Sequence, residues 1–535
     1  MELSKTLLML QKANKTKAFA LNNVLDFSGR ISFFWHSPYE KFFLATLQDV
    51  LSSVVTGMKR FHLKISSKKW RPLSTIRNQG DAPMRVLTPL CSAILLAMAC
   101  ASQAQAMSLT EAIQSTIATH PELASRVDAR LSADEQIKVA KGGFYPSVDL
   151  NAAYGRGYSD NTTTRSRGNH NTEILTYTQS ELRLRQMLFD GFNTANEVAR
   201  TKGVSNSRAY YAQGTAQDLA LRTIEVYLEV LKRRELVTLA KNNLQAHMRV
   251  NDQIGLRTQR GIGSNADADQ STARRALAQN NLDTAEVDLA DAEANFYSVV
   301  GRMPDELETP PSTRGELPAT LPEAQQSMVE NNPYLKSAQA DIQSAESQYE
   351  VAKSPFYPRF DAEAAVGANN NVQGDQGHDN EWRVGVVMNY NLFRGGSDKA
   401  RLASDAHQIN QAMDIRNNAL RQLNENIHLA WNAMQNAKKQ TPTAREYAET
   451  TTRVRAAYQD QFGLGQRTLL DLLDSENELY NANRRYTEVR YTEEFSMYRV
   501  LANMGQLLSK QRVVLPADAI AATEVKNEAR LPELK

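Results

Sequence analysis

Hydrophobic and polar positions alternate with a period of two in four segments of the chain, and each segment is predicted to be a β-strand. In the clearest segment, every second residue from Trp382 to Leu392 is apolar or aromatic, and mostly polar residues or glycine lie between them. Polar loops rich in Gly, Asn and Asp separate the members of each pair, which predicts two hairpins. The predicted strands span residues 147–158, 173–189, 359–369 and 381–393.

Each predicted hairpin is followed by long helical segments that are joined at a glycine-containing turn. The predicted helices span residues 194–258, 265–302, 398–462 and 468–508. Within the second of them, apolar residues recur at intervals of three and four, as in the seam of a coiled coil. These positions are Leu282, Ala285, Leu289, Ala292, Phe296 and Val299.

The order of motifs occurs twice, which predicts a tandem duplication. Phe144-Tyr145-Pro146 recurs 212 residues later, and Leu188-Phe189-Asp190-Gly191 recurs as Leu392-Phe393-Arg394-Gly395 after 204 residues. The turn Gly261-Ile262-Gly263 pairs with Gly463-Leu464-Gly465 at an offset of 202. We therefore divide the chain into a first repeat, a second repeat and a C-terminal tail, at residues 107–315, 316–515 and 516–535.

The segment before the repeats is typical of a secretory leader. Residues 84–106 combine a basic start, a short apolar run and the sequence Ala104-Gln105-Ala106, which predicts a signal peptide with an Ala-x-Ala cleavage site. A lipoprotein site at Cys100 is the alternative. Residues 1–83 show no sustained period, and we interpret them as an over-long gene start or an extended leader that is absent from the mature protein.

Charge and composition exclude several classes of function. Residues 1–106 carry 14 Lys and Arg against 5 Asp and Glu, whereas the rest of the chain carries 48 against 55, so the repeats are acidic and nucleic-acid binding is excluded. Both cysteines, Cys91 and Cys100, precede the repeats, so no thiol chemistry is expected there. Catalytic, metal-ligating and nucleotide-binding motifs are absent from the sequence, which predicts neither an enzyme nor a cofactor.

The strands are long enough to cross an outer membrane, although a soluble hairpin packed on one face fits their pattern equally well. Four strands cannot close a membrane barrel, because the smallest closed barrels have about eight. An open edge in lipid would leave backbone groups unpaired at several kcal/mol each. If the strands lie in a membrane, at least two chains must share one barrel, and the pattern does not choose between two and three.

The segment Gly465-Gln466-Arg467-Thr468-Leu469-Leu470-Asp471-Leu472-Leu473-Asp474, together with the duplicated plan, resembles the TolC family of outer-membrane efflux and secretion channels. The resemblance implies an α+β fold in which a homotrimer shares an outer-membrane β-barrel, four strands per chain, continuous with a long coiled-coil periplasmic tunnel. Within the family, the sequence is most similar to members of type I secretion systems that export large adhesins.

The same resemblance implies a selectivity filter at the periplasmic end. Asp471 and Asp474 are three residues apart, so they lie on one side of a helix. In a threefold assembly they would form rings that favour cations and raise the pKa of their own carboxylates. The alternative is that both are solvated carboxylates near a helix N-terminus, where the helix dipole stabilises them.

The resemblance also implies that some residues at this end hold the tunnel closed and that others form a docking surface. Arg467 and Asp269 would bridge neighbouring helices and keep the tunnel shut. Phe462 stands where the family often has a tyrosine that joins this network, and Phe lacks the hydroxyl. The turn glycines Gly261, Gly263, Gly463 and Gly465 reverse the helices and would receive a periplasmic adaptor.

These inferences predict a passive exit duct of a tripartite type I secretion system in the outer membrane of a Gram-negative cell. Its partners would be outer-membrane lipid, the adaptor (a membrane fusion protein) and, through the adaptor, an inner-membrane ABC transporter. A multidrug or metal efflux channel of the same family is the first alternative. A soluble periplasmic coiled-coil scaffold is the second.

Overall fold

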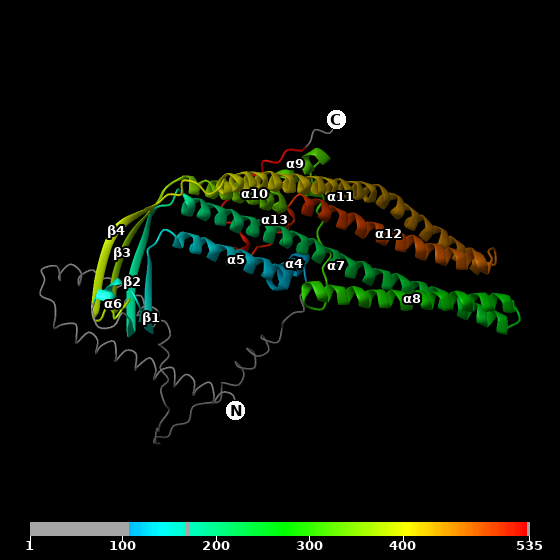
Figure 1. The fold of residues 1–535 in the computed structure, drawn as a ribbon. Coiled ribbons are helices and arrows are strands. Elements are labelled where there is room, and N and C mark those ends of the chain that lie inside the picture. The colour runs from blue at the N-terminus through cyan, green and yellow to red at the C-terminus, as the bar shows by residue number, and fades with distance from the viewer. Residues whose placement is uncertain (1–105, 167–171, 532–535) are drawn as a thin grey trace, which may run out of the picture. The chain divides into compact units, whose positions relative to one another are not determined.

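A computed structural model describes residues 106–166 and 172–531 (Figure 1). Residues 1–83 and the predicted signal peptide, apart from Ala106, lie outside the described residues, as does Cys100. The first repeat contains α4 (Leu109–Thr119), α5 (Pro121–Gly142), β1 (Ser147–Ser159), α6 (Thr162–Ser166), β2 (Glu173–Phe189), α7 (Asn193–Gln259) and α8 (Asn265–Val300). The second contains α9 (Leu321–Asn331), α10 (Pro333–Ala352), β3 (Arg359–Asn370), β4 (His378–Asn389), α11 (Ser397–Gly463), α12 (Leu469–Asn503) and α13 (Leu507–Lys510).

The short helices at the start of both repeats begin and end in the same way. His120 and Asn332 each end one helix and cap the next, and a proline follows each of them at the first helical position. The side chain of His120 accepts the backbone N–H of Glu122 at 3.3 Å, and that of Asn332 accepts the N–H of Tyr334 at 3.0 Å. His120 is therefore a helix cap, because its ring satisfies a backbone donor at a helix start.

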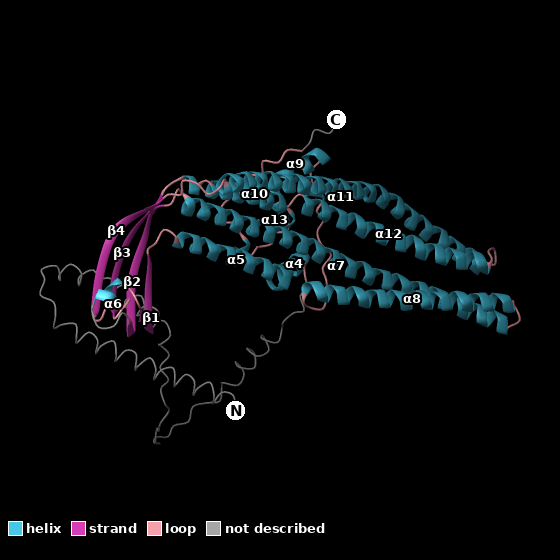
Figure 2. Ribbon diagram, in the orientation of Figure 1, coloured by secondary structure: helices cyan, strands magenta, loops and turns pink. Residues whose placement is uncertain are grey.

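The four strands form one antiparallel sheet in the order β1-β2-β3-β4, and Figure 2 shows it at one end of the helices. The last strand ends earlier than its apolar alternation predicts, at Asn389 rather than at residue 393. Asn389 pairs with Arg359, and Pro358 directly before Arg359 has no N–H to continue the ladder. Residues 390–393 therefore have no strand opposite them, although their side chains keep the alternating pattern.

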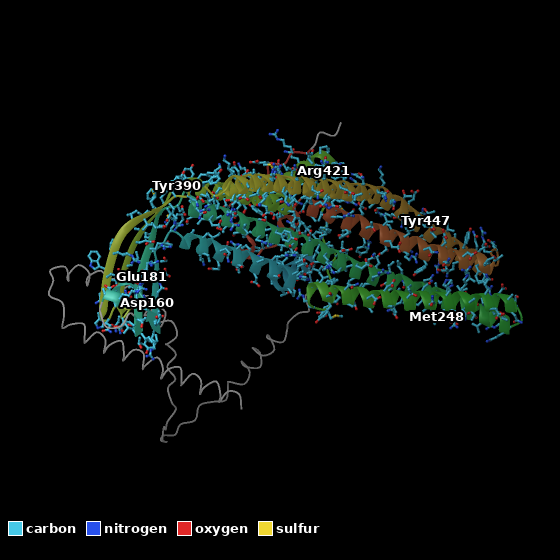
Figure 3. The ribbon with its side chains drawn as sticks, in the orientation of Figure 1. Asp160, Glu181, Met248, Tyr390, Arg421 and Tyr447 are labelled. Atoms are coloured by element: carbon cyan, nitrogen blue, oxygen red, sulfur yellow. The ribbon has the colours of Figure 1, made fainter. Side chains whose placement is uncertain are left out.

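The two faces of the sheet differ in chemistry. One face carries apolar rows across all four strands, of which Leu150, Leu182, Val366 and Trp382 form one. Trp382 in this row is 76% exposed. The opposite face carries ion pairs between strands, from Arg383 to Glu181 at 2.8 Å and from Arg185 to Glu363 at 2.9 Å. Figure 3 labels Glu181 on the sheet. A sheet in which the apolar face is exposed and the other face is charged lacks a partner for its apolar side.

Two helical hairpins, α7–α8 and α11–α12, make up most of the remaining structure, and α7 packs against α12, α10 and α5. The predicted seam is confirmed at Leu282, Ala292 and Phe296, which are buried. Helix α8 ends at Val300 rather than at residue 302, because Gly301 adopts a φ of +82°. Among the described helices, none is long and apolar enough to cross a membrane.

Helix α12 also stops short of its predicted end. It runs to Asn503, and α13 forms a separate turn after Gly505. Gly505 has a φ of +72°, and a Cβ there would lie 2.8 Å from the carbonyl oxygen of Asn331. The break therefore follows from a left-handed residue in close contact with the end of α9.

The C-terminal segment is packed against the helices. Ala519, Val525 and Ala529 are buried. The backbone N–H of Val525 donates to the hydroxyl of Tyr210 at 2.9 Å, and the amide of Asn527 donates to the carbonyl of Val329 at 2.9 Å. The described part of the predicted tail thus connects α7 of the first repeat with α9 of the second.

Candidate functional site

The α7–α8 and α11–α12 turns have the same backbone geometry. The N–H of Ile262 donates to the carbonyl of Arg257 at 3.0 Å, and the N–H of Gln466 donates to that of Gln461 at 2.9 Å. Both turns contain one left-handed glycine, Gly261 with a φ of +73° and Gly465 with a φ of +74°. Gly261 therefore corresponds to Gly465 at an offset of 204, and the pairing at 202 is wrong by two residues.

The four turn glycines have different structural roles. Gly261 and Gly465 supply the positive φ that reverses the chain. Gly263 lies close to the preceding helix, since a Cβ there would be 2.9 Å from the hydroxyl oxygen of Thr258. Gly463 is the last residue of α11, has an ordinary φ and faces open space. The backbone therefore requires glycine at Gly261 and Gly465 and leaves room for a side chain at Gly463.

Arg467 binds residues of its own turn. Its Nε donates to Gln461 Oε1 at 2.9 Å, and its guanidinium lies 4.3 Å from the centre of the Tyr458 ring. Its Nη1 is 3.8 Å from Asp471 Oδ2. Both side chains of this ion pair are 38% exposed, so the pair is weak and the guanidinium remains accessible to another chain.

Asp471 caps the start of α12 rather than standing free. Its carboxylate accepts the hydroxyl and the backbone N–H of Thr468, and its own N–H donates to the Thr468 hydroxyl, which completes a capping box. The Thr468 hydroxyl and N–H, followed by the charge of Arg467, lower the pKa of Asp471 below its ordinary value. In the single subunit the pKa of Asp471 is therefore lowered, because these donors favour the charged form, and the rise expected for an assembled ring stays a prediction.

Asp474 reaches from α12 to the other hairpin. Its Oδ1 lies 2.8 Å from Nη2 of Arg274 on α8. The side chain of Asp474 is 56% exposed and that of Arg274 is 29% exposed. Each predicted ring carboxylate thus has a cationic neighbour within its own subunit, and the two neighbours are different arginines.

The predicted network of Arg467, Asp269 and Phe462 is not assembled within one subunit. Asp269 lies exposed on the second turn of α8, and the contacts of Arg467 described above do not include it. Phe462 is buried in a core with Leu469, Leu472 and Leu473, and the guanidinium of Arg257 lies 4.9 Å from the centre of its ring. Val250 and Ile254 of α7 belong to the same core, so Phe462 packs the two hairpins against each other. A contact between Arg467 and Asp269 of neighbouring subunits stays a prediction.

Sequence reasoning missed a layer of charged residues between the two hairpins. Glu476 on α12 is almost fully buried and pairs with Arg455 on α11 at 2.5 Å. His247 on α7 is 3% exposed, and burial lowers its pKa, with the charge of Arg274 acting in the same direction and Glu476 opposing both. No local motif marks these residues, because they come from four helices that are far apart in the sequence. Within the described ranges, no group of three or more His, Cys, Asp or Glu side chains could hold a metal ion.

Known proteins match the chain over most of both repeats. The Outer membrane efflux protein family matches residues 112–302 and 324–496. The outer membrane efflux protein BepC of Brucella suis is 25% identical over 398 residues, covering 73% of this chain and 83% of BepC. The proteases secretion protein PrtF of Dickeya chrysanthemi is 26% identical over 406 residues, covering 72% of this chain and 86% of PrtF.

Solved structures agree with this assignment at the level of the fold. The CmeC outer membrane channel of Campylobacter jejuni superposes with a TM-score of 0.65 at 14% identity, covering 81% of this chain and 95% of CmeC. It matches an α+β chain with long helices and a four-stranded sheet, as predicted from the sequence. On the family match over more than half of its length, the chain belongs to the outer membrane efflux protein family of TolC-type channels.

Proposed function

We propose that this chain forms, as a homotrimer, the passive exit duct of a tripartite type I secretion system. Family membership already assigns it to the outer membrane and to channels rather than enzymes. The observation that carries the proposal is the sheet, in which the apolar face is exposed and the opposite face is charged. Lipid would cover the apolar rows, and the charged rows would line a hydrated lumen.

The sheet edges support assembly from several copies. In the described structure, β1 pairs only with β2 and β4 pairs only with β3, so each outer strand has one unpaired edge. Unpaired backbone groups cost several kcal/mol each in lipid. Pairing β4 of one copy with β1 of the next removes both edges, and three copies joined in this way, as in the proposed homotrimer, would close one barrel.

The turns at the other end of the helices would form the gate. Figure 2 shows both turns at the end of the helices opposite the strands. There, Asp471 and Asp474 would form rings that favour cations. An Arg467–Asp269 pair between neighbouring subunits would hold the gate closed, and the half-exposed guanidinium of Arg467 leaves it accessible for that contact.

The glycine turns would also receive the periplasmic adaptor, which would connect the duct to an inner-membrane ABC transporter. A separate energy source is needed because the sequence contains no nucleotide-binding motif. Similarity to PrtF supports secretion, whereas similarity to BepC supports efflux as the second candidate. Crosslinking in intact cells followed by pull-down distinguishes the two, since a transporter of the ABC class that exports proteins is expected for secretion and a drug or metal pump for efflux.

Substitution on the two faces of the sheet tests the membrane assignment. Val384 lies on the apolar face and is 73% exposed. Val384→Arg should abolish recovery of the chain in the outer-membrane fraction, because a cation at the lipid midplane costs about 2–4 kcal/mol per copy. Glu381→Gln on the charged face is the matched control and should leave recovery unchanged. Recovery of Val384→Arg in the outer membrane at the unsubstituted level would contradict the proposal, and recovery of the unsubstituted chain in the soluble periplasm would favour a scaffold.

A further inference from the structure

Arg274 connects the two hairpins close to the proposed gate. It projects from α8 of the first repeat, and its Nη2 lies 2.8 Å from Oδ1 of Asp474 on α12 of the second repeat. A hydrogen bond between two charged groups is stronger than a neutral one and fixes the orientation of both. The partner residues are 200 positions apart in the sequence, so the contact depends on how the two hairpins pack.

The acidic residues near Asp474 on α12 are paired with other cations, so Asp474 is the carboxylate whose charge Arg274 compensates. Glu476, two residues after Asp474 on α12, pairs with Arg455 of α11. Asp471 is held by Thr468 and lies 3.8 Å from Arg467. His247 on α7 is the remaining titratable neighbour of Arg274, and it is buried among the same helices. Asp471, Asp474 and Glu476 therefore each lie close to a different arginine.

We infer that Arg274 is a specificity-determining residue of the channel, because it neutralises Asp474 and so sets the strength of the cation-selective ring. The inference rests on the proposed function, in which Asp474 lines the periplasmic opening. A paired carboxylate acts on passing ions as a dipole, and its field falls off faster than that of a free charge. Removing Arg274 in a trimer would expose three uncompensated carboxylates at one level of the opening.

Ion selectivity in planar bilayers tests this inference. The purified full-length channel and its variants are compared in a KCl gradient, and the permeability ratio of K⁺ to Cl⁻ is obtained from the reversal potential. Arg274→Gln should raise this ratio about twofold or more and lower the La³⁺ concentration that half-blocks the current. Arg275→Gln is the matched control, since the neighbouring Arg275 is exposed, and it should retain the unsubstituted ratio.

A double substitution separates pairing from a general loss of positive charge. Asp474→Asn should lower the ratio, and Arg274→Gln combined with Asp474→Asn should lie close to the unsubstituted channel, because both members of the pair are then neutral. An unchanged ratio in Arg274→Gln, or the same change in Arg275→Gln, would overturn the inference. If Arg274→Gln does not fold, Arg274→Met, which keeps a long side-chain stem without the charge, takes its place with the same expected rise, and an unchanged ratio contradicts the inference.

The outcomes distinguish failure of the inference from failure of the proposed function. If Asp474→Asn lowers the ratio and Arg274→Gln leaves it unchanged, the inference alone fails and the ring stands. If the channel conducts but neither substitution alters the permeability ratio, Asp474 is not part of the filter. The inference and the proposed cation-selective ring then both fail at this residue. If the unsubstituted protein conducts no ions, the channel itself is wrong.

Discussion

The α7–α8 and α11–α12 turns share a backbone and differ in side chains. Helices α7 and α11 both contain 67 residues, and each is followed by a turn with the same hydrogen bond and one left-handed glycine. At the common offset of 204, Arg467 replaces Gly263, Phe462 replaces Thr258 and Leu473 replaces Asp269. The second turn therefore has a buried aromatic residue and an arginine where the first turn has Thr258 and Gly263, although its core also includes Val250 and Ile254 of α7.

This difference indicates how the duplicated chain divides its tasks. The backbone of the turn reverses the chain between two long helices, and its geometry is the same in both copies. The second copy adds a buried aromatic residue, a complete capping box and an accessible guanidinium. We therefore expect the second turn to be the more stable one and to carry the gate, whereas the first turn supplies the counter-charge Arg274 from further along α8.

The largest expected effect comes from the core of the second turn. Phe462→Ala should destabilise that turn locally by about 3 kcal/mol, because a buried aromatic side chain leaves a cavity. The corresponding Thr258→Ala should cost about 1 kcal/mol or less, since it removes one hydroxyl hydrogen bond within a helix. Hydrogen exchange measured on peptides from the two turns checks the comparison, and equal acceleration in both variants would contradict it.

The left-handed glycines should behave alike in the two turns. Gly261→Ala and Gly465→Ala should each cost about 1–2 kcal/mol, because both positions have the same positive φ and no atom lies near the added methyl group. Gly463→Ala is the matched control and should stabilise α11 by up to about 1 kcal/mol. The order of thermal unfolding midpoints tests this, and a loss of stability in Gly463→Ala would show that the turn is assigned in the wrong register.

Removal of the arginine of the second turn should make it resemble the first. Arg467→Ser removes the proposed ion pair with Asp269 of the neighbouring subunit, worth about 1 kcal/mol for a partly exposed guanidinium, and so should shift the ratio of open to closed gates roughly fivefold. Single-channel recordings should show longer or larger openings. Arg260→Ser in the first turn is the control and should conduct as the unsubstituted channel does. Unchanged openings in Arg467→Ser would mean that other residues hold the gate closed.

The smallest expected effect is a pH dependence confined to the second turn. The pKa of Asp471 is lowered in the folded state, so its contribution to stability is present above the ordinary pKa of about 3.9 and is lost as pH falls through the lower folded value. Asp471→Asn should remove this dependence. Pepsin cleavage at the second turn is measured for the unsubstituted protein and for Asp471→Asn. The rate for the unsubstituted protein, divided by the rate for the variant, should rise as pH falls from about 4 to about 2. A constant ratio would mean that the capping carboxylate does not titrate in this range.

Much of the fold could be predicted from the sequence, because the signals are local and periodic. The strand alternation, the duplicated Phe-Tyr-Pro and the coiled-coil seam each reflect how nearby residues pack, and they predicted two β-hairpins and two long helical hairpins. The predicted ends of helices and strands were less accurate where contact with another element determines the end. Asn389 ends β4 because β3 begins after Pro358, and Gly505 breaks α12 beside the end of α9.

The site was harder to predict because it depends on contacts between distant helices. The family resemblance pointed to Asp471, Asp474 and Arg467, which lie at or just after one turn, and their roles stay predictions. Motif spacing gave no indication that Asp474 meets Arg274, that Glu476 meets Arg455, or that Phe462 is buried. It also paired the glycine turns two residues out of register, because Gly-x-Gly occurs in both turns while only one glycine in each is left-handed.

The most direct test of the account is the subunit count of the protein in its membrane. The sheet of the described residues has two unpaired edges, so a chain can form the wall of a pore only together with copies of itself. Native mass spectrometry of the full chain, extracted from outer membranes in detergent, should show three subunits and no stable lone chain. A well-folded single subunit, recovered in detergent without its copies, would contradict the account.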